Sequence, residues 1–256
     1  MTLLKIIAAL LVAVAFFFFI LQRSMIFQTP EVSLPTSMPD YVEHLTLEEG
    51  YGLLLSPSTL VNDPAPLLIY THGNAAAAFW HIEHMTTLRE AGFYVLLLEY
   101  PGYVGAPGKP SLRSIERSAL EAYDSVTARA EIDATKVIAY GRSIGGGAAT
   151  LITTQRPLAA LALESTFTSL SALVAEKRMP FFLLRDRFDN AKVVRELSIP
   201  VFLFHGSKDT IIPIHHSERL SELAKNHEFF QAPCGHNDCP PTWTALLEFL
   251  SNQGVL

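Results

Sequence analysis

The sequence predicts one α/β domain with a mostly parallel β-sheet and helices on both faces, preceded by a single apolar helix. Three observations support this prediction. Short, continuously apolar runs alternate with helical segments along most of the 256 residues, as expected for parallel strands buried on both faces. The stretch 3–21 is almost uncharged. A serine flanked by glycines follows one of the predicted strands.

The first element is the apolar run Leu3–Leu21 (LLKIIAALLVAVAFFFFIL), with Lys5 as its single charge. A helix of about 20 apolar residues spans a hydrocarbon core of about 30 Å. A cleavable signal peptide would have a shorter apolar region followed by an A-x-A-like site. The triplet Ala13–Ala15 lies inside the run instead. We therefore predict an uncleaved membrane anchor over residues 1–24. Because Lys5 lies near one end of the run and Arg23 follows the other end, the orientation of the run stays open.

Residues 25–40 are rich in proline and small polar residues and are predicted to form a linker. We expect a chain that starts near Thr29 to keep the chemistry of the domain over 41–256. An antiparallel hairpin is expected over Val42–Leu55. The predicted strands are Tyr51–Leu55, Leu67–Tyr70, Tyr94–Leu98, Val137–Tyr140, Leu158–Leu163, Val201–Phe204 and Glu228–Gln231. The predicted helices are Ala76–Ala91, Leu112–Ala130, Ile144–Gln155, His215–Ala224 and Thr242–Leu250.

Composition excludes some functions. The net charge is −6 and no dense stripe of lysine and arginine occurs, which argues against nucleic-acid binding. No phosphate-binding loop or metal-ligand cluster is evident, so neither a cofactor nor a metal is expected. Cys234 and Cys239 form a weak zinc signal without two further ligands. The sequence favours two free thiols; a disulfide around the loop is the alternative, and it would persist only in an oxidising compartment.

The run Gly141–Gly145 (GRSIG) joins a predicted strand to a predicted helix. This is the context in which a G-x-S-x-G sequence exposes a nucleophilic serine on a sharp turn. Side chains at the flanking positions would collide with neighbouring backbone, which accounts for the glycines. Ser143 is therefore the predicted nucleophile.

A serine hydroxyl is a weak nucleophile and needs a base oriented by an acid. When the serine lies on such a turn, the acid and then the histidine follow it along the chain. Asp209 follows a later predicted strand, and His236 follows the last one. We predict Asp209 as the acid and His236 as the base. Glu164 and Asp238 are the alternative acids.

An acyl-transfer site also needs donors for the developing oxyanion. The backbone N–H of Ile144, directly after the nucleophile, is the first expected donor. The second is expected in the loop His72–Ala75, which follows the predicted strand Leu67–Tyr70 and is called the oxyanion loop below. Its donor is the N–H of either Asn74 or Ala75.

The segment Ser165–Ile199 lies between the predicted strand after the nucleophile and the predicted strand before the acid, and its middle reads MPFFLL. The favoured interpretation of this middle part is a helix that covers the core. The alternative is an apolar wall for an acyl chain, formed by Phe181 and Phe182. Together with Phe79 and Trp80 beside the oxyanion loop, these residues predict an apolar acyl group.

Five short motifs together resemble the α/β-hydrolases, in particular small members with an N-terminal membrane anchor, the "α/β-hydrolase domain-containing" serine hydrolases. They are HGN at 72–74, EYPGY at 99–103, GRSIG at 141–145, HGSKD at 205–209 and GHND at 235–238. The resemblance spans most of the domain and is specific to the fold, but not to the substrate. It also implies a short cap, which we expect within Ser165–Ile199. It departs at 103–108, where relatives usually place Gly-x-Ser after the aromatic residue.

The function predicted from these residues is a membrane-anchored serine hydrolase that cleaves carboxylic esters or thioesters of an apolar acyl group through an acyl-enzyme. Its expected partners are a small-molecule or lipid ester and the membrane. A peptidase or amidase is the nearest alternative, because the same triad and oxyanion hole serve both reactions. A catalytically silent binding module is the other alternative.

Overall fold

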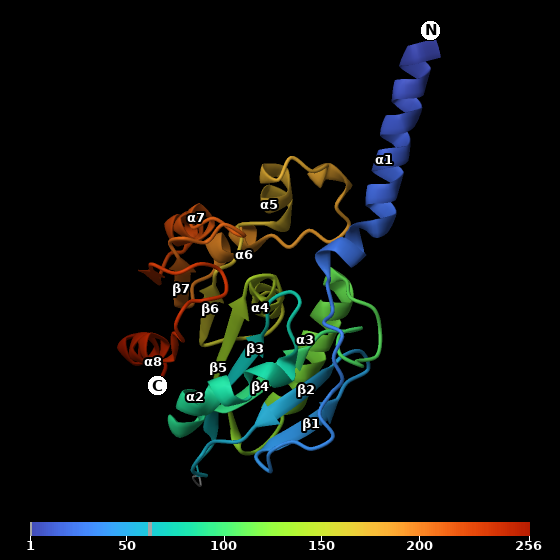
Figure 1. Cartoon of the computed structure of the whole chain (residues 1–256). Coiled ribbons are helices and arrows are strands. Elements are labelled where there is room, and N and C mark those ends of the chain that lie inside the picture. The colour runs from blue at the N-terminus through green and yellow to red at the C-terminus, as the bar shows by residue number, and fades with distance from the viewer. Residues whose placement is uncertain (1, 61–62) are drawn as a thin grey trace.

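The computed structural model describes residues 2–60 and 63–256, which form an α/β domain with a helix projecting from it (Figure 1). Met1, the first residue of the predicted anchor, lies outside the described residues. An eight-stranded sheet has the order β1-β2-β4-β3-β5-β6-β7-β8. The strands are β1 (Val42–Thr46), β2 (Tyr51–Leu55), β3 (Ala65–Thr71), β4 (Tyr94–Glu99), β5 (Ile132–Arg142), β6 (Ala160–Glu164), β7 (Val201–Gly206) and β8 (His227–Ala232).

The sheet is parallel from β4 to β8 and antiparallel at the end where the chain enters it. Strand β1 pairs with β2, and β2 pairs with β4, both in antiparallel register. The hairpin predicted at the start of the sheet is therefore confirmed. Because the remaining pairs are parallel, the loops that follow β3, β5, β6, β7 and β8 all leave from the same edge of the sheet.

Helices cover both faces of this sheet. They are α2 (Thr86–Glu90), α3 (Leu112–Thr127), α4 (Gly145–Thr153), α5 (Leu170–Glu176), α6 (Asn190–Glu196), α7 (His215–Leu223) and α8 (Trp243–Asn252). Side chains of α3, α4, α6 and α7 pack in one core cluster. Those of α2 and α8 pack in a second cluster. The predicted α/β class, with helices on both faces, is confirmed.

Two local predictions are wrong. The segment 76–91 is not one helix but two 3₁₀ turns, η1 (Ala78–His81) and η2 (Glu83–Met85), followed by the short α2. The buried Glu99 carboxylate accepts the N–H of Ala78, so a tertiary contact overrides the helix propensity of the alanines. The middle of the cap is also not a helix over the core. It is the 3₁₀ turn η3 (Phe181–Leu183), which contains no buried residue.

The amino-terminal helix α1 (Thr2–Ile26) extends away from the domain (Figure 1). Its stretch Leu3–Ile26 has a mean hydropathy of 2.9 and is long enough to cross a membrane. The chain then turns onto the domain. Phe27, directly after α1, is buried in the core and packs edge-on against Phe188 of the cap.

Candidate active site

Ser143 lies on a strained turn between β5 and α4. Its φ of 56° is in the left-handed region, which non-glycine residues seldom adopt. A Cβ at Gly141 would lie 2.4 Å from the Gly145 carbonyl oxygen, and a Cβ at Gly145 would lie 2.0 Å from the carbonyl oxygen of Thr71. Both flanking positions therefore require glycine, and the turn holds the serine at the edge of the sheet.

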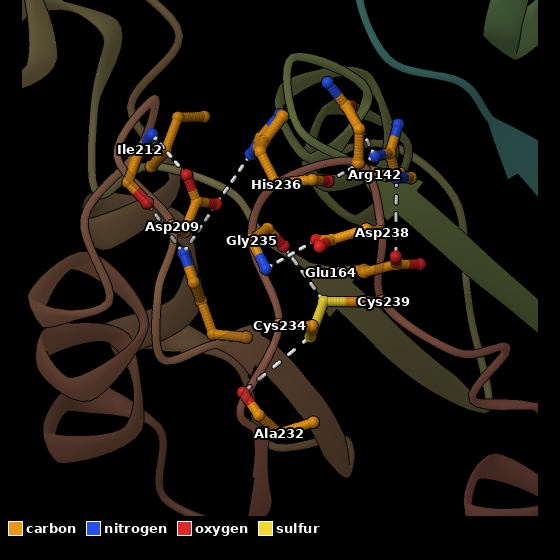
Figure 2. The surroundings of a disulfide bond; sticks show 12 residues. Arg142, Glu164, Asp209, Ile212, Ala232, Cys234, Gly235, His236, Asp238 and Cys239 are labelled. Carbon is orange, nitrogen blue, oxygen red and sulfur yellow. Dashed lines mark hydrogen bonds and ion pairs between the residues drawn. A yellow bond between two sulfur atoms is a disulfide. The ribbon is translucent and has the colours of Figure 1, made fainter.

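A chain of hydrogen bonds connects the three residues that the sequence predicts as a triad. His236 Nε2 is 3.1 Å from Ser143 Oγ, and His236 Nδ1 is 2.6 Å from Asp209 Oδ2. The other carboxylate oxygen, Oδ1, accepts the N–H groups of Ile211 and Ile212, each at 2.9 Å. Figure 2 shows Asp209 between the Ile212 backbone and the His236 ring. With its proton on Nδ1, the ring presents a lone pair to the serine.

A second histidine also contacts the acid. His205 is fully buried, and its Nε2 lies 2.8 Å from the Ile212 carbonyl oxygen and 3.2 Å from Asp209 Oδ2. Burial alone raises the pKa of Asp209. Hydrogen bonds from His205, His236 and the Ile212 N–H outweigh burial and hold the pKa of the carboxyl well below its usual range. The acid therefore stays ionised and can orient the base.

The two alternative acids make other contacts. The Glu164 carboxylate accepts the hydroxyl of Tyr140, and Asp238 accepts the N–H of Gly235 at 2.6 Å. In the described part of the chain, neither carboxylate contacts the imidazole of His236. The geometry therefore favours Asp209 over both.

Arg142, the residue before the nucleophile, was not singled out by the sequence. It lies 3.4 Å from Glu164 and donates to the backbone carbonyl of His236 and to Asn237 Oδ1. The arginine thus connects the nucleophile turn to the histidine loop. No local sequence signal distinguishes it, because position x of a G-x-S-x-G sequence is unrestricted.

Two backbone N–H groups near the serine are free to bind an oxyanion. Within residues 2–60 and 63–256, the N–H groups of Ile144 and Asn74 donate no hydrogen bond. The N–H of Ala75 donates to the Gln28 carbonyl oxygen at 3.0 Å. Of the two alternatives for the second donor, the geometry therefore favours Asn74.

Gln28, in the predicted linker, also holds the oxyanion loop through its N–H, which donates to Asn74 Oδ1 at 2.8 Å. The Tyr103 hydroxyl donates to the same oxygen at 2.8 Å. The segment after α1 is thus part of the structure around the site. Sequence analysis missed this role because Gln28 belongs to no motif and is far from Asn74 in the chain.

Cys234 and Cys239 form a disulfide, so the prediction of two free thiols is wrong. Their Cα atoms are 5.1 Å apart, because Asp238 accepts the Gly235 N–H and folds the loop into a tight turn. The bridge closes the loop that carries His236, and the two lie close together in Figure 2.

A cavity of about 510 Å³ lies beside this loop. It is lined by Tyr70, Ala76, Trp80, His81, His84, Arg142, Glu164, Asn237, Cys239, Pro240, Pro241, Thr242 and Trp243. Of the four aromatic residues predicted to bind substrate, Trp80 lines the cavity. Phe79 packs against both core clusters. Phe181 and Phe182 do not line it and are 45% and 65% exposed.

Two buried polar atoms of residues in the cavity wall, His81 Nε2 and Trp243 Nε1, have no hydrogen-bond partner among the described residues. Burial lowers the pKa of His81 to about 3, so its ring is neutral at physiological pH. The cavity therefore has aromatic walls and an uncharged His81 ring, while the two unpaired atoms are buried beneath its surface.

One cluster has residue types that can bind a metal. Glu176, His215 and His216 each offer a ligand atom within 4.8 Å of the others. However, the Thr168 N–H donates to His216 Nδ1. The proton of the neutral ring is therefore on Nε2, which faces Glu176 at 3.5 Å. This arrangement favours a contact between the histidine and the carboxylate over metal ligation.

Comparisons with known proteins agree with the fold. No family model matches the chain. An uncharacterized protein of Mycobacterium tuberculosis is 33% identical over 179 residues, which are 68% of this chain and 63% of the relative. The alpha/beta hydrolase domain-containing protein WAV2 of Arabidopsis thaliana is 28% identical over 203 residues, covering 70% and 65% of the two chains.

Among solved structures, the acetyl xylan esterase of Paenibacillus sp. R4 superposes with a TM-score of 0.70. The match covers 86% of this chain and 87% of the esterase at 16% identity, a level at which the likeness concerns the fold. This chain spans about 63% of the length of the first curated relatives that it matches. The sheet order, the nucleophile turn and these relatives agree on one conclusion: the chain has the α/β-hydrolase fold and is similar to proteins of that superfamily.

Proposed function

We propose that this protein is a serine hydrolase, anchored in a membrane by α1, that cleaves esters or thioesters of apolar acyl groups. The observation that carries the proposal is the hydrogen-bonded chain Ser143–His236–Asp209, with two free N–H groups beside the serine. A nucleophile, a base and an orienting acid within hydrogen-bond reach are what acyl transfer requires.

In the first half of the proposed reaction, Ser143 Oγ attacks the ester carbonyl carbon while His236 Nε2 accepts the hydroxyl proton. The Asp209 carboxylate stabilises the imidazolium that forms. The oxyanion of the tetrahedral intermediate binds the N–H groups of Ile144 and Asn74. In other serine hydrolases, each such donor contributes roughly 10²–10³ in rate.

The intermediate collapses when His236 returns the proton to the leaving alcohol or thiol, and the acyl group stays on Ser143. Water then attacks the acyl-enzyme with His236 again as the base, which releases the carboxylic acid and restores the serine. Since His236 must accept a proton and then donate it, its ring has to stay within hydrogen-bond distance of the serine. The Arg142 contact and the disulfide both support that position.

The cavity beside the histidine loop supports the proposed substrate class. Its walls include Tyr70, Trp80 and Trp243, which suit an apolar or aromatic group. Aromatic walls of this kind suit the apolar group of an ester.

The disulfide supports a location for the domain. Disulfides persist in oxidising compartments and are rare in the cytosol. With α1 as the anchor, the Cys234–Cys239 bridge leads us to propose that the catalytic domain faces the non-cytosolic side of the membrane.

The experiment that tests the proposed function is labelling with a fluorophosphonate probe, followed by hydrolysis of p-nitrophenyl esters of increasing chain length. Ser143→Ala should lose the label and roughly 10⁴–10⁶ of the rate. Ser207→Ala is the matched control, because Ser207 is exposed and only two residues from Asp209. Equal labelling of wild type and Ser143→Ala would reject the nucleophile. A folded wild-type protein without label or turnover would favour a silent binding module.

A further inference from the structure

The turn η3 in the cap exposes two neighbouring phenylalanines. Phe181 is 45% exposed and Phe182 is 65% exposed, although large aromatic side chains are normally well buried. Exposed cationic side chains surround them, namely Lys177, Arg178, Arg185 and Arg187. Aromatic side chains beside lysine and arginine are typical of segments that lie in a membrane interface.

Hydrogen bonds fix this turn to the end of α1. Gln22 is fully buried; its side-chain amide donates to the Leu183 carbonyl oxygen at 3.1 Å and accepts the Arg185 N–H at 2.7 Å. Arg23 makes a two-point contact with the buried Asp186 at 2.7 and 3.0 Å. These bonds keep the turn beside the helix, and Figure 1 shows the segment after α5 reaching the base of α1.

A further contact gives the depth of the turn along α1. The Arg185 guanidinium lies 5.4 Å from the ring centroid of Phe19, which belongs to the last turn of the apolar run. Where α1 crosses a bilayer, Phe19 therefore lies near its boundary, and Arg185 beside it lies at the level of the headgroups. Phe181 and Phe182 belong to the same short segment, so they reach the same boundary.

We propose that the turn Met179–Leu184 lies in the surface of the bilayer that α1 crosses, as a second membrane contact of the domain. The phenylalanines enter the region of the first acyl carbons, and the surrounding cations face lipid phosphates. This inference rests on the proposed anchoring by α1. Because Gln28, two residues after α1, contacts the oxyanion loop, this second contact would turn the candidate active site toward the membrane. The site would then take ester substrates from the lipid.

The test uses the full chain in bilayer nanodiscs of zwitterionic and anionic phospholipids. Phe182→Cys is labelled with an environment-sensitive NBD maleimide, since Cys234 and Cys239 are bonded to each other and do not react. Nitroxide-labelled lipids serve as quenchers, with the nitroxide near the headgroup end of the acyl chain for positions 182 and 60 and near its methyl end for position 12. Leu60→Cys is the matched control, because Leu60 is 69% exposed and precedes β3 at the opposite edge of the sheet.

At position 182 we expect a blue-shifted NBD emission, most of which is quenched by the nitroxide-labelled lipid. At position 60 we expect no quenching. Equal quenching at the two positions would overturn the proposal. Val12→Cys, in the middle of the apolar run, tests the proposed anchor separately from the proposed second contact. Quenching at 12 without quenching at 182 would reject the second contact and leave the anchor intact. No quenching at 12 would reject both. Fluorophosphonate labelling of Ser143 is a separate measurement that none of these outcomes changes.

Discussion

The two sides of the candidate active site are held by different parts of the chain. On the acid–histidine side, Asp209 and His236 are held by the domain itself, through buried hydrogen bonds and the Cys234–Cys239 bridge. The oxyanion loop, His72–Ala75, is held in part by Gln28, which directly follows the apolar helix and the buried Phe27.

This difference shows that α1, the proposed anchor, is not joined to the domain by a flexible tether. A tether would leave the oxyanion loop unchanged when removed. Here the segment Gln22–Gln28 binds the cap, the core and the oxyanion loop. A change in α1 can therefore reach the oxyanion loop on one side of the candidate site, while the acid–histidine side stays independent of it.

The largest expected effect is on the acid–histidine side. Asp209→Asn should keep the shape of the site but remove the carboxylate that selects the His236 tautomer, a change that lowers kcat by about 10⁴ in a serine protease. We expect a loss of similar size on p-nitrophenyl acetate. Asp238→Asn is the control, since Asp238 bonds the Gly235 N–H rather than the ring; it should lose less than about tenfold. A greater loss for Asp238→Asn, or for Glu164→Gln, would mean that the acid is another carboxylate.

A smaller effect is expected on the oxyanion side when the chain is shortened. A variant that starts at Gln22 keeps the bonds of Gln22–Gln28 (the docked segment) to the domain, whereas one that starts at Thr29 loses Phe27 and Gln28. Loss of the buried Phe27 side chain costs about 3–5 kcal/mol, and a displaced oxyanion loop costs on the order of 10² in rate. The sequence alone led us to expect that a chain starting near Thr29 keeps its chemistry; the structure leads to the opposite expectation.

Thermal unfolding and kcat on a soluble ester, measured for both shortened chains, separate stability from chemistry. Asn74→Ala provides a full-length comparison, because it removes the oxygen that accepts the Gln28 N–H but keeps its own backbone donor. Tyr103→Phe removes only the second bond to that oxygen and should have the milder effect. Equal kcat for the chains starting at Gln22 and at Thr29 would show that the docked segment does not support the oxyanion loop.

Residues that lie in short motifs after predicted strands could be identified from the sequence, whereas contacts between residues far apart in the chain could not. The α/β class followed from apolar runs, and Ser143, Asp209 and His236 could be selected because each follows a predicted strand within a short motif. The structure places these three in contact. The role of Gln28, the exposure of the cap phenylalanines and the helix broken at residues 76–91 could not be predicted. Each depends on a contact with a residue far away in the chain, such as Ala78 with Glu99.

The smallest expected effect comes from opening the disulfide. The bridge closes a short loop, so in the chain-entropy view it stabilises the fold by only about 2–3 kcal/mol. Its position matters more, because His236 lies within that loop. Asp209 and Arg142 still bond to His236 after reduction. The ring should therefore become more mobile but stay within reach of Ser143.

A reducing agent, or the double change Cys234→Ser and Cys239→Ser, should therefore lower kcat by a few-fold and leave KM nearly unchanged, since the groups that bind substrate are unaffected. Mass spectrometry of protein from its own membrane, alkylated before and after reduction, shows whether the bridge is present there. Two cysteines alkylated without reduction would mean that the thiols are free in the cell and that the domain faces a reducing compartment. A bonded pair would agree with a non-cytosolic domain, in which the chain's own covalent bridge, rather than its anchor, stabilises the histidine side of the site.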